Sequence, residues 1–172
     1  MLKYVFMNTP LGRMLAAEYE GQLCLLEFDN GKKAMEYLAE LANRLKCNAV
    51  EENSPILHEV ERQLKGYFQG DRREFEIPLL LIGSDFQKSV WSALQSIPRG
   101  QTTDYGSMAS RIGKPQAVRA VGRANASNPI AIIVPCHRVI GKDGSLVGYG
   151  GELWRKKWLL EHEGALTPSV LS

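Results

Sequence analysis

Residues 128–140 read NPIAIIVPCHRVI, and the second half of the chain is organised around this stretch. An apolar run over residues 130–134 ends at a proline, and Cys136, His137 and Arg138 follow directly. A short apolar run with such a boundary predicts a buried strand. The sequence therefore places a thiol, an imidazole and a guanidinium together at the end of a buried strand.

The residues before this stretch predict a helix-turn-helix. A first helix begins at Ser84 and is stopped at Pro98. Two shorter helices are expected over residues 103–112 and 115–127, joined by a tight turn at Gly113. Two short helices with such a connection are typical of DNA-binding folds.

The second of these short helices is unusually slim. Its small residues include Ala117, Ala120 and Gly122, while Arg119 and Arg123 lie four positions apart and so share one face. Small residues also allow tight packing against a neighbouring helix. Two arginines on the same face favour contact with a nucleic acid.

The residues after the Cys-His pair predict a hairpin and a closing helix. Asp143-Gly144 is a strong hairpin-turn signal, and Tyr149 lies among three glycines. A helix is expected over residues 151–164 with a terminal glycine as its stop. Residues 165–172 would form a loose tail.

The first half predicts a small lobe that mixes strands and helices, and no chemical motif occurs in it. Strands are expected over residues 2–9, 11–19, 22–28 and 73–83, and helices over residues 31–46 and 54–70. The whole chain is thus expected to be α+β, with one domain over residues 1–80 and another over residues 84–164.

Charge and cysteine content narrow the class of protein. Residues 1–83 carry three more acidic than basic side chains, and residues 84–172 carry five more basic than acidic ones. A basic second half is typical of a polyanion-binding domain, although chance variation in surface charge gives the same pattern. No cysteine spacing predicts a disulfide framework, a metal site or a cofactor. Without a membrane-spanning run or a signal-peptide pattern, a cytoplasmic protein is expected.

Cys136 and His137 suggest thiolate chemistry. A thiol needs a base or a positive environment to become a nucleophile. Neighbours on an extended strand point to opposite sides, so a bridging water would have to carry the proton to the imidazole. Glu161 and Glu163 are the candidate carboxylates to orient the histidine. The alternative is a buried strand-end cysteine beside a core histidine.

Together these motifs resemble the O6-alkylguanine-DNA alkyltransferases, also called methylated-DNA–protein-cysteine methyltransferases. The resemblance rests on NPIAIIVPCHRVI together with IPRGQTTDYG at residues 97–106, RAVGRA at 119–124 and GYGG at 148–151, and it is close over residues 84–164. It implies a winged-helix domain in that range and a ribonuclease-H-like lobe before it.

The resemblance also implies roles at the reacting centre. Cys136 corresponds to the alkyl acceptor, and His137 and Glu163 correspond to the relay that removes its proton through a water. Asn128 corresponds to the hinge between the recognition helix and the cysteine segment. Lys156 falls on the family's lysine near the cysteine.

Other residues would hold the DNA. The resemblance assigns Tyr105 to the 3′ phosphate and the base edge, and Arg119 to the space that the extruded base leaves. The carbonyls of Cys136 and Val139 would accept from the guanine amine. The remaining positions of the pocket and the DNA surface would be Tyr149, Gly150, Ala117, Ala120, Gly122 and Arg123.

The implied activity is DNA repair by direct reversal. The alkyl group of O6-alkylguanine, or of O4-alkylthymine, would pass to Cys136 after the nucleotide is flipped out through the minor groove of double-stranded DNA. A thioether has no easy leaving step, so the protein would act only once. It is also expected to be a monomer and to need no cofactor.

Glu152 and Arg123 depart from the family pattern. Each stands where a small residue, usually glycine in the case of Glu152, is more usual. A carboxylate suits a helix N-terminus, but it could also narrow the pocket rim. Arg123 would add a phosphate contact.

Other functions fit parts of this pattern. A helix-turn-helix regulator without transfer would usually dimerise and read the major groove, and it would not need Cys136 and His137. A cysteine hydrolase would need a direct Cys-His dyad and an oxyanion hole. A relative that only marks damage would lack the cysteine.

Overall fold

A computed structural model describes residues 1–149 and 152–167 and divides the chain into two compact units. The first unit comprises Met1–Ile82 and Pro129–Ala131, and the second comprises Gly83–Asn128 and the residues from Ile132 onward. The short segment Pro129–Ala131 thus belongs to the first unit, although it lies within the range that the sequence assigns to the second domain. The α+β class expected from the sequence is confirmed.

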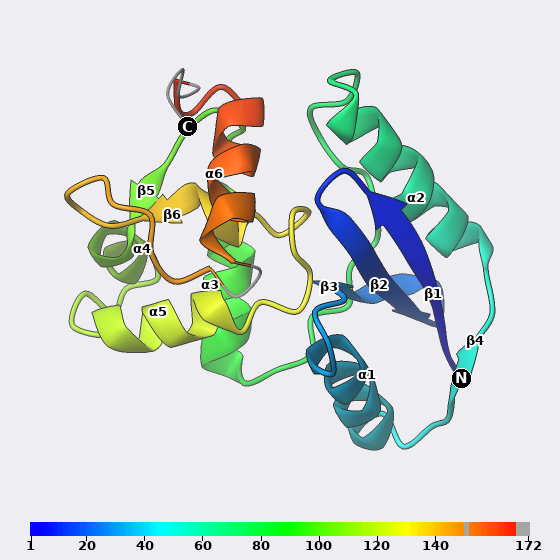
Figure 1. The fold of residues 1–172 in the computed structure, drawn as a ribbon. Helices are drawn as coiled ribbons and strands as arrows, with labels where there is room; N and C mark the ends of the chain where they lie inside the picture. The colour runs from blue at the N-terminus through cyan, green and yellow to red at the C-terminus, as the bar shows by residue number, and fades with distance from the viewer. Residues whose placement is uncertain (150–151, 168–172) are drawn as a thin grey trace. The chain divides into compact units, whose positions relative to one another are not determined.

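The first unit is built on a four-stranded sheet in the order β3-β2-β1-β4 (Figure 1). Its strands are β1 (Leu2–Thr9), β2 (Gly12–Tyr19), β3 (Gln22–Phe28) and β4 (Ala49–Glu51). The first three form an antiparallel meander, and β4 pairs with β1 in parallel. The short strand β4 has no counterpart among the expected elements, because three residues are too few for a periodic pattern.

Two helices cover this sheet, α1 (Lys33–Arg44) and α2 (Pro55–Phe68). Leu15 and Ala17 of β2 pack in one core cluster with α1. Met14 and Ala16, which alternate with them, are equally buried. Because alternate residues of a strand face opposite sides, this second set lies on the other face, and α2 covers it.

The segment over residues 73–83 is not the strand that its apolar residues predict. Only Leu79 forms a bridge, to Leu23 of β3. The backbone of Leu23 bonds to the Pro78 carbonyl and to the Leu80 amide, both at 2.9 Å. Pro78 has no amide hydrogen to donate, which stops the ladder on one side. On the other side the backbone of Leu26 bonds to Pro129 and Ala131 instead.

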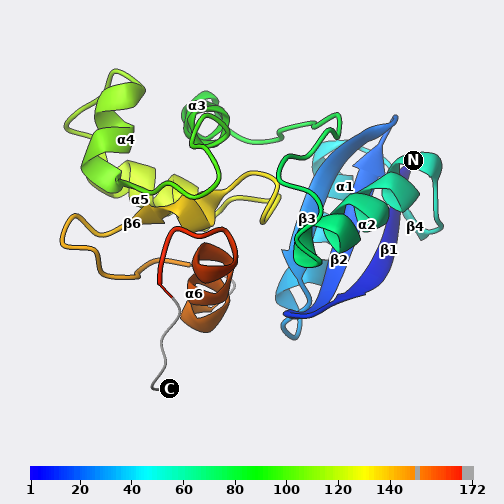
Figure 2. The same ribbon diagram turned by 90° about the horizontal axis from the view of Figure 1, so that it is seen from above.

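Among its described residues, the second unit contains four α-helices (Figure 2), one turn of 3-10 helix and a two-stranded sheet. The helices are α3 (Asp85–Leu94), α4 (Tyr105–Arg111), α5 (Val118–Ala126) and α6 (Leu153–His162), and the strands are β5 (Thr103–Asp104) and β6 (Val139–Ile140). Ser84 begins α3 through a reciprocal capping box with Gln87. The expected helix-turn-helix is formed by α4 and α5, which pack against each other and against α3.

The strand expected over residues 130–134 is wrong. Ile130 forms a single bridge to Leu26, and the chain then turns. Ile132 adopts φ 70°, a left-handed conformation that a β-branched residue rarely takes. After this turn Cys136–Arg138 forms one turn of 3-10 helix rather than a strand end.

The expected hairpin is also only partly right. The turn at Asp143-Gly144 forms, with the Asp143 carboxylate accepting from the Ser145 amide at 3.0 Å. However, β6 pairs in parallel with β5, and no second hairpin strand follows it within residues 141–149. No helix in the described ranges is long and apolar enough to cross a bilayer.

Candidate active site

Cys136 opens the 3-10 helix and is nearly buried, with 6% of its surface exposed. Its amide bonds to the Val134 carbonyl at 2.8 Å, which fixes the backbone directly before the thiol. Successive residues of a 3-10 helix are about 120° apart around the axis, so Cys136 and His137 point in different directions. The expected separation of the two side chains therefore arises from a helical backbone and not from an extended one.

A buried carboxylate joins His137 and Arg138. His137 Nε2 lies 2.8 Å from Oε2 of Glu163, which follows the last turn of α6. Arg138 donates to Glu163 Oε1 from Nε at 2.8 Å and to Oε2 from Nη2 at 3.1 Å. Of the two candidate carboxylates, Glu163 is the one that reaches the histidine. Glu161 is half-buried, and its Oε1 lies 3.8 Å from Lys157 Nζ instead.

The charges in this cluster determine where the protons lie. Burial alone would raise the pKa of Glu163, but His137 and the Arg138 guanidinium lower it well below its ordinary value. Burial lowers the pKa of His137, and Glu163 offsets only part of this effect. A neutral imidazole beside a carboxylate carries its hydrogen on Nε2. Nδ1 is then the basic nitrogen, and it is buried without a hydrogen-bond partner in the described residues.

Lys156 places a second buried cation near the thiol. Its ammonium is fully buried and donates to the carbonyls of Val139 and Val147, both at 2.6 Å. Burial lowers the pKa of Lys156 to about 8, although its electrostatic interaction with Cys136 opposes the shift. The ammonium thereby joins β6 to the loop that carries Tyr149, which is 8% exposed.

Tyr105 lies at the start of α4 and contacts the same loop. Its hydroxyl donates to the Val147 carbonyl at 3.1 Å. Burial raises the pKa of Tyr105, and the nearby Cys136 raises it further. A Cβ on Gly148 would lie 2.9 Å from the Tyr105 oxygen, and Gly148 also has φ 66°, so this position requires glycine.

Two buried asparagines hold the backbone around the cysteine. Asn128 donates from Nδ2 to the Val134 carbonyl at 2.7 Å, and Asn125 donates to the Cys136 carbonyl at 3.3 Å. Sequence reasoning assigned a position to Asn128 but missed Asn125 and the contacts of Arg138. The available signal for Asn125 was a polar residue four positions after Val121, on the apolar side of α5.

The outer side of α5 is a basic surface. Arg119 and Arg123 are exposed, and in the described parts of the chain neither forms a hydrogen bond or an ion pair. Ala117, Ala120 and Gly122 are half-buried along the same helix. Gly150, which the sequence also assigns to the pocket, lies outside the described residues.

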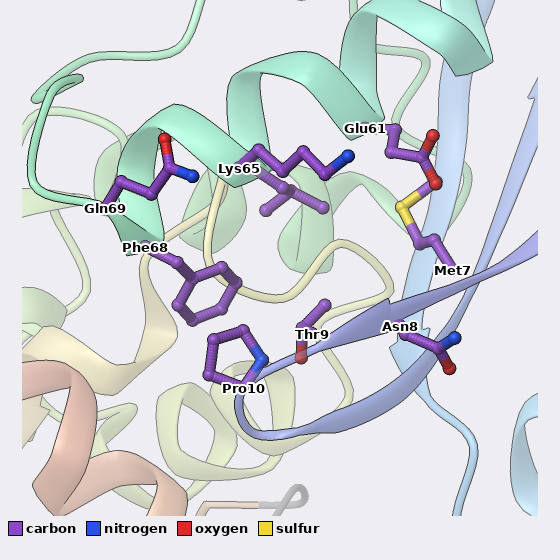
Figure 3. A pocket seen from close by; sticks show the side chains of 9 residues that line it. Met7, Asn8, Thr9, Pro10, Glu61, Lys65, Phe68 and Gln69 are labelled. Carbon is purple, nitrogen blue, oxygen red and sulfur yellow. The ribbon is translucent and has the colours of Figure 1, made fainter.

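A separate pocket of about 250 Å³ lies in the first unit (Figure 3). It lies between α2 and the turn that joins β1 to β2. Its lining consists of Met7, Asn8, Thr9, Pro10, Glu61, Leu64, Lys65, Phe68 and Gln69. These residues include no cysteine or histidine, so this pocket offers neither a thiol nor an imidazole for catalysis. No cluster of metal-ligating side chains occurs in residues 1–149 and 152–167.

Glu152 gives the first testable consequence of this geometry. It adopts φ 79° and ψ 143° before α6, a conformation that side chains with a Cβ rarely take, and its carboxylate accepts from Trp154 Nε1 at 2.7 Å. Glu152→Gly is expected to raise the free energy of unfolding by about 1 kcal/mol, because the relief of backbone strain exceeds the loss of an exposed hydrogen bond. Urea denaturation measures the change. Glu152→Ala keeps the Cβ and loses the hydrogen bond. If it raised the free energy of unfolding as much as Glu152→Gly does, backbone strain would not be the cause.

The buried His137 makes stability depend on pH. The pKa of His137 is lowered in the native protein, so below about pH 6.5 the unfolded chain binds a proton that the native protein does not bind. The free energy of unfolding should therefore fall as pH drops from about 7, by up to about 1.4 kcal/mol per pH unit. His137→Gln should flatten this dependence in urea titrations between pH 7 and 5. His58→Gln, at an exposed position of α2, is the control and should keep the wild-type slope.

Known proteins are similar to this chain over nearly its whole length. Residues 2–81 match the 6-O-methylguanine DNA methyltransferase ribonuclease-like domain, and residues 85–165 match the DNA binding domain of the same family. A methylated-DNA–protein-cysteine methyltransferase of Methanosarcina acetivorans is 45% identical over 162 residues, covering 94% of this chain and 98% of the relative. A Mycobacterium tuberculosis protein of the same name is 56% identical over 110 residues, which are 64% of this chain and 67% of the relative.

Solved structures give the same result. The crystal structure of Mycobacterium tuberculosis O6-methylguanine methyltransferase has a TM-score of 0.80 at 40% identity, covering 99% of this chain and 98% of that one. The structure of Mycobacterium tuberculosis OGT in complex with DNA also has a TM-score of 0.80, at 41% identity and with 95% and 93% coverage. A chain with both matching domains and this buried Cys-His-Glu arrangement belongs to the 6-O-methylguanine DNA methyltransferase family.

Proposed function

We propose that this protein repairs double-stranded DNA by moving the alkyl group of O6-alkylguanine, or of O4-alkylthymine, onto Cys136. The observation that carries the proposal is the buried His137–Glu163 pair beside a cysteine that also interacts with a buried lysine. The names of the relatives, which are methylated-DNA–protein-cysteine methyltransferases, support the same reaction.

The proton of Cys136 leaves through His137. Glu163 keeps the imidazole hydrogen on Nε2, and Nδ1 accepts the thiol proton through a bridging water. The positive charge of Lys156 favours the thiolate that results. The sulfur then forms a bond to the alkyl carbon as the carbon–O6 bond breaks, and the released electron pair remains on the base until a proton neutralises it.

The product explains why the protein acts only once. Transfer leaves a thioether on Cys136, and a thioether carbon has no good leaving group for water to displace. No resident cofactor takes part, because the sulfur itself is the acceptor. The protein is consumed by one reaction.

DNA contact is assigned to α5 and to the residues around the pocket. The exposed Arg119 and Arg123 supply charge for phosphates, and the small residues Ala117, Ala120 and Gly122 let the helix approach a minor groove closely. The complex of the M. tuberculosis relative with DNA supports this partner.

Around the flipped base, the resemblance gives each pocket residue its role. Tyr105 contacts the 3′ phosphate, Arg119 fills the space left in the stack, and Asn128 holds the hinge. The carbonyls of Cys136 and Val139 and the residues Tyr149 and Gly150 surround the base.

The proposed form is a cytoplasmic monomer. The acceptor must remain a reduced thiol, and Cys24, Cys47 and Cys136 form no disulfide within the described residues. A reducing compartment keeps such thiols available.

The decisive experiment measures stoichiometry. Mixed with a duplex that carries one O6-methylguanine, each molecule should gain the mass of one methyl group, and peptide mapping should place it on Cys136. Cys136→Ala should gain nothing, whereas Cys24→Ala and Cys47→Ala should still react. Several turnovers per molecule, or a label on another cysteine, would contradict the proposal. Duplex binding without any mass change would instead favour a helix-turn-helix regulator.

Arg119 gives a second test. Its proposed work is to offset the cost of extruding the base, a few kcal/mol that a free O6-alkylguanine base does not incur. Arg119→Ala should slow repair of duplex DNA by a factor of tens, since about 1.4 kcal/mol is tenfold in rate, and should leave reaction with the free base nearly unchanged. Single-turnover rates on both substrates provide the measurement.

Arg123→Ala is the matched control for this test, because it removes the same side chain one turn away. It should weaken binding and reduce its salt dependence but have little effect at saturating DNA. Equal losses on duplex and free base for Arg119→Ala would exclude the stacking role.

A further inference from the structure

Asn125 places a buried hydrogen-bond acceptor beside Cys136. None of the roles described above uses this acceptor. The residue is 1% exposed, and its Nδ2 donates to the Cys136 carbonyl at 3.3 Å. Its Oδ1 is buried and has no hydrogen-bond partner among the described residues. A buried acceptor without a partner is costly, so such atoms are usually satisfied by protein, water or a ligand.

The orientation of this amide follows from its neighbours. Exchanging its oxygen and nitrogen would bring Oδ1 against the Cys136 carbonyl, which places two acceptors in contact. The same amide interacts with the Tyr105 hydroxyl. Asn125 therefore lies between Cys136 and Tyr105, two groups to which the proposed function brings the damaged base.

The carbonyls expected to receive the guanine amine already accept hydrogen bonds. The Val139 carbonyl accepts from Lys156 at 2.6 Å, and the Cys136 carbonyl accepts from Asn125. Each retains one lone pair. The exocyclic amine of O6-alkylguanine has two hydrogens, and alkylation at O6 removes the hydrogen from N1. The amine is thus the only N–H donor on that edge of the base. One of its hydrogens is available to the Val139 carbonyl, and the other to Asn125 Oδ1, because Asn125 Nδ2 already bonds to the Cys136 carbonyl.

Building on the proposed function, we propose that Asn125 Oδ1 accepts a hydrogen bond from the exocyclic amine of the extruded base. Asn125 is then a specificity-determining residue that favours guanine adducts. O4-alkylthymine has no N–H donor on this edge and leaves the acceptor unpaired. A site that hydrogen-bonds a substrate group discriminates strongly against an analogue that lacks it.

The test compares substrates that differ only in the amine. Duplexes carry O6-methylguanine, O6-methylhypoxanthine or O4-methylthymine at one position, and methyl transfer to the protein is followed under single-turnover conditions with saturating DNA. The rate ratio of O6-methylguanine to O6-methylhypoxanthine should fall about tenfold from wild type to Asn125→Leu. In Asn125→Leu, the rate of transfer from O4-methylthymine should fall by no larger a factor than the rate of transfer from O6-methylhypoxanthine.

Two further variants keep the result interpretable. Asn125→Ala removes the same amide without adding bulk, and it gives the same comparison if the leucine variant does not fold in a thermal melt. Asn128→Leu removes the other buried amide that holds this backbone, so it should slow all three substrates by the same factor. If the Asn125 variants also slow all substrates equally, the residue only supports the backbone and the proposal is wrong. Absence of transfer by the wild-type protein would instead overturn the proposed function itself.

Discussion

The arrangement of the active site depends on one buried carboxylate. Glu163 accepts from both His137 and Arg138, and its charge is stable in the interior only because these partners surround it. Arg138 also donates to the Ile97 carbonyl at 2.7 Å, which links the end of α6 to the segment after α3. Removing any one member leaves a buried charge or donor without its partner, so the chemistry of His137 and the packing of this unit cannot be separated.

A second buried cation lies near the thiol. Lys156 contacts two backbone carbonyls, those of Val139 and Val147, and the latter also accepts from Tyr105. One loop is thereby held by a helix residue and by the first residue of α4. A lysine is costly to bury, and its effect on a neighbouring thiolate explains why a chain would retain it at this position.

Two residues with strained backbone lie close in sequence to these groups, while two others, Glu20 and Lys46, lie in the first unit. Ile132 and Glu152 both adopt positive φ angles, and they lie four residues before the thiol and four residues before the buried lysine. Strained residues of this kind persist where the surrounding structure fixes them, and they are often found at functional sites. The unusual residue Glu152 therefore changes the energetics of the backbone as well as the charge near the helix.

The sequence by itself determined the helices of both units, the three long strands, and the residue types at the reacting centre, because periodicity, capping residues and motifs are local signals. It did not determine that residues 130–134 turn rather than extend, or that Asn125 and Arg138 contact the cysteine segment and the carboxylate. These features are set by partners far away in the chain: Ile130 pairs with Leu26, and Arg138 reaches Glu163. A local apolar pattern states that a segment is buried, but only the tertiary structure decides which groups it meets there.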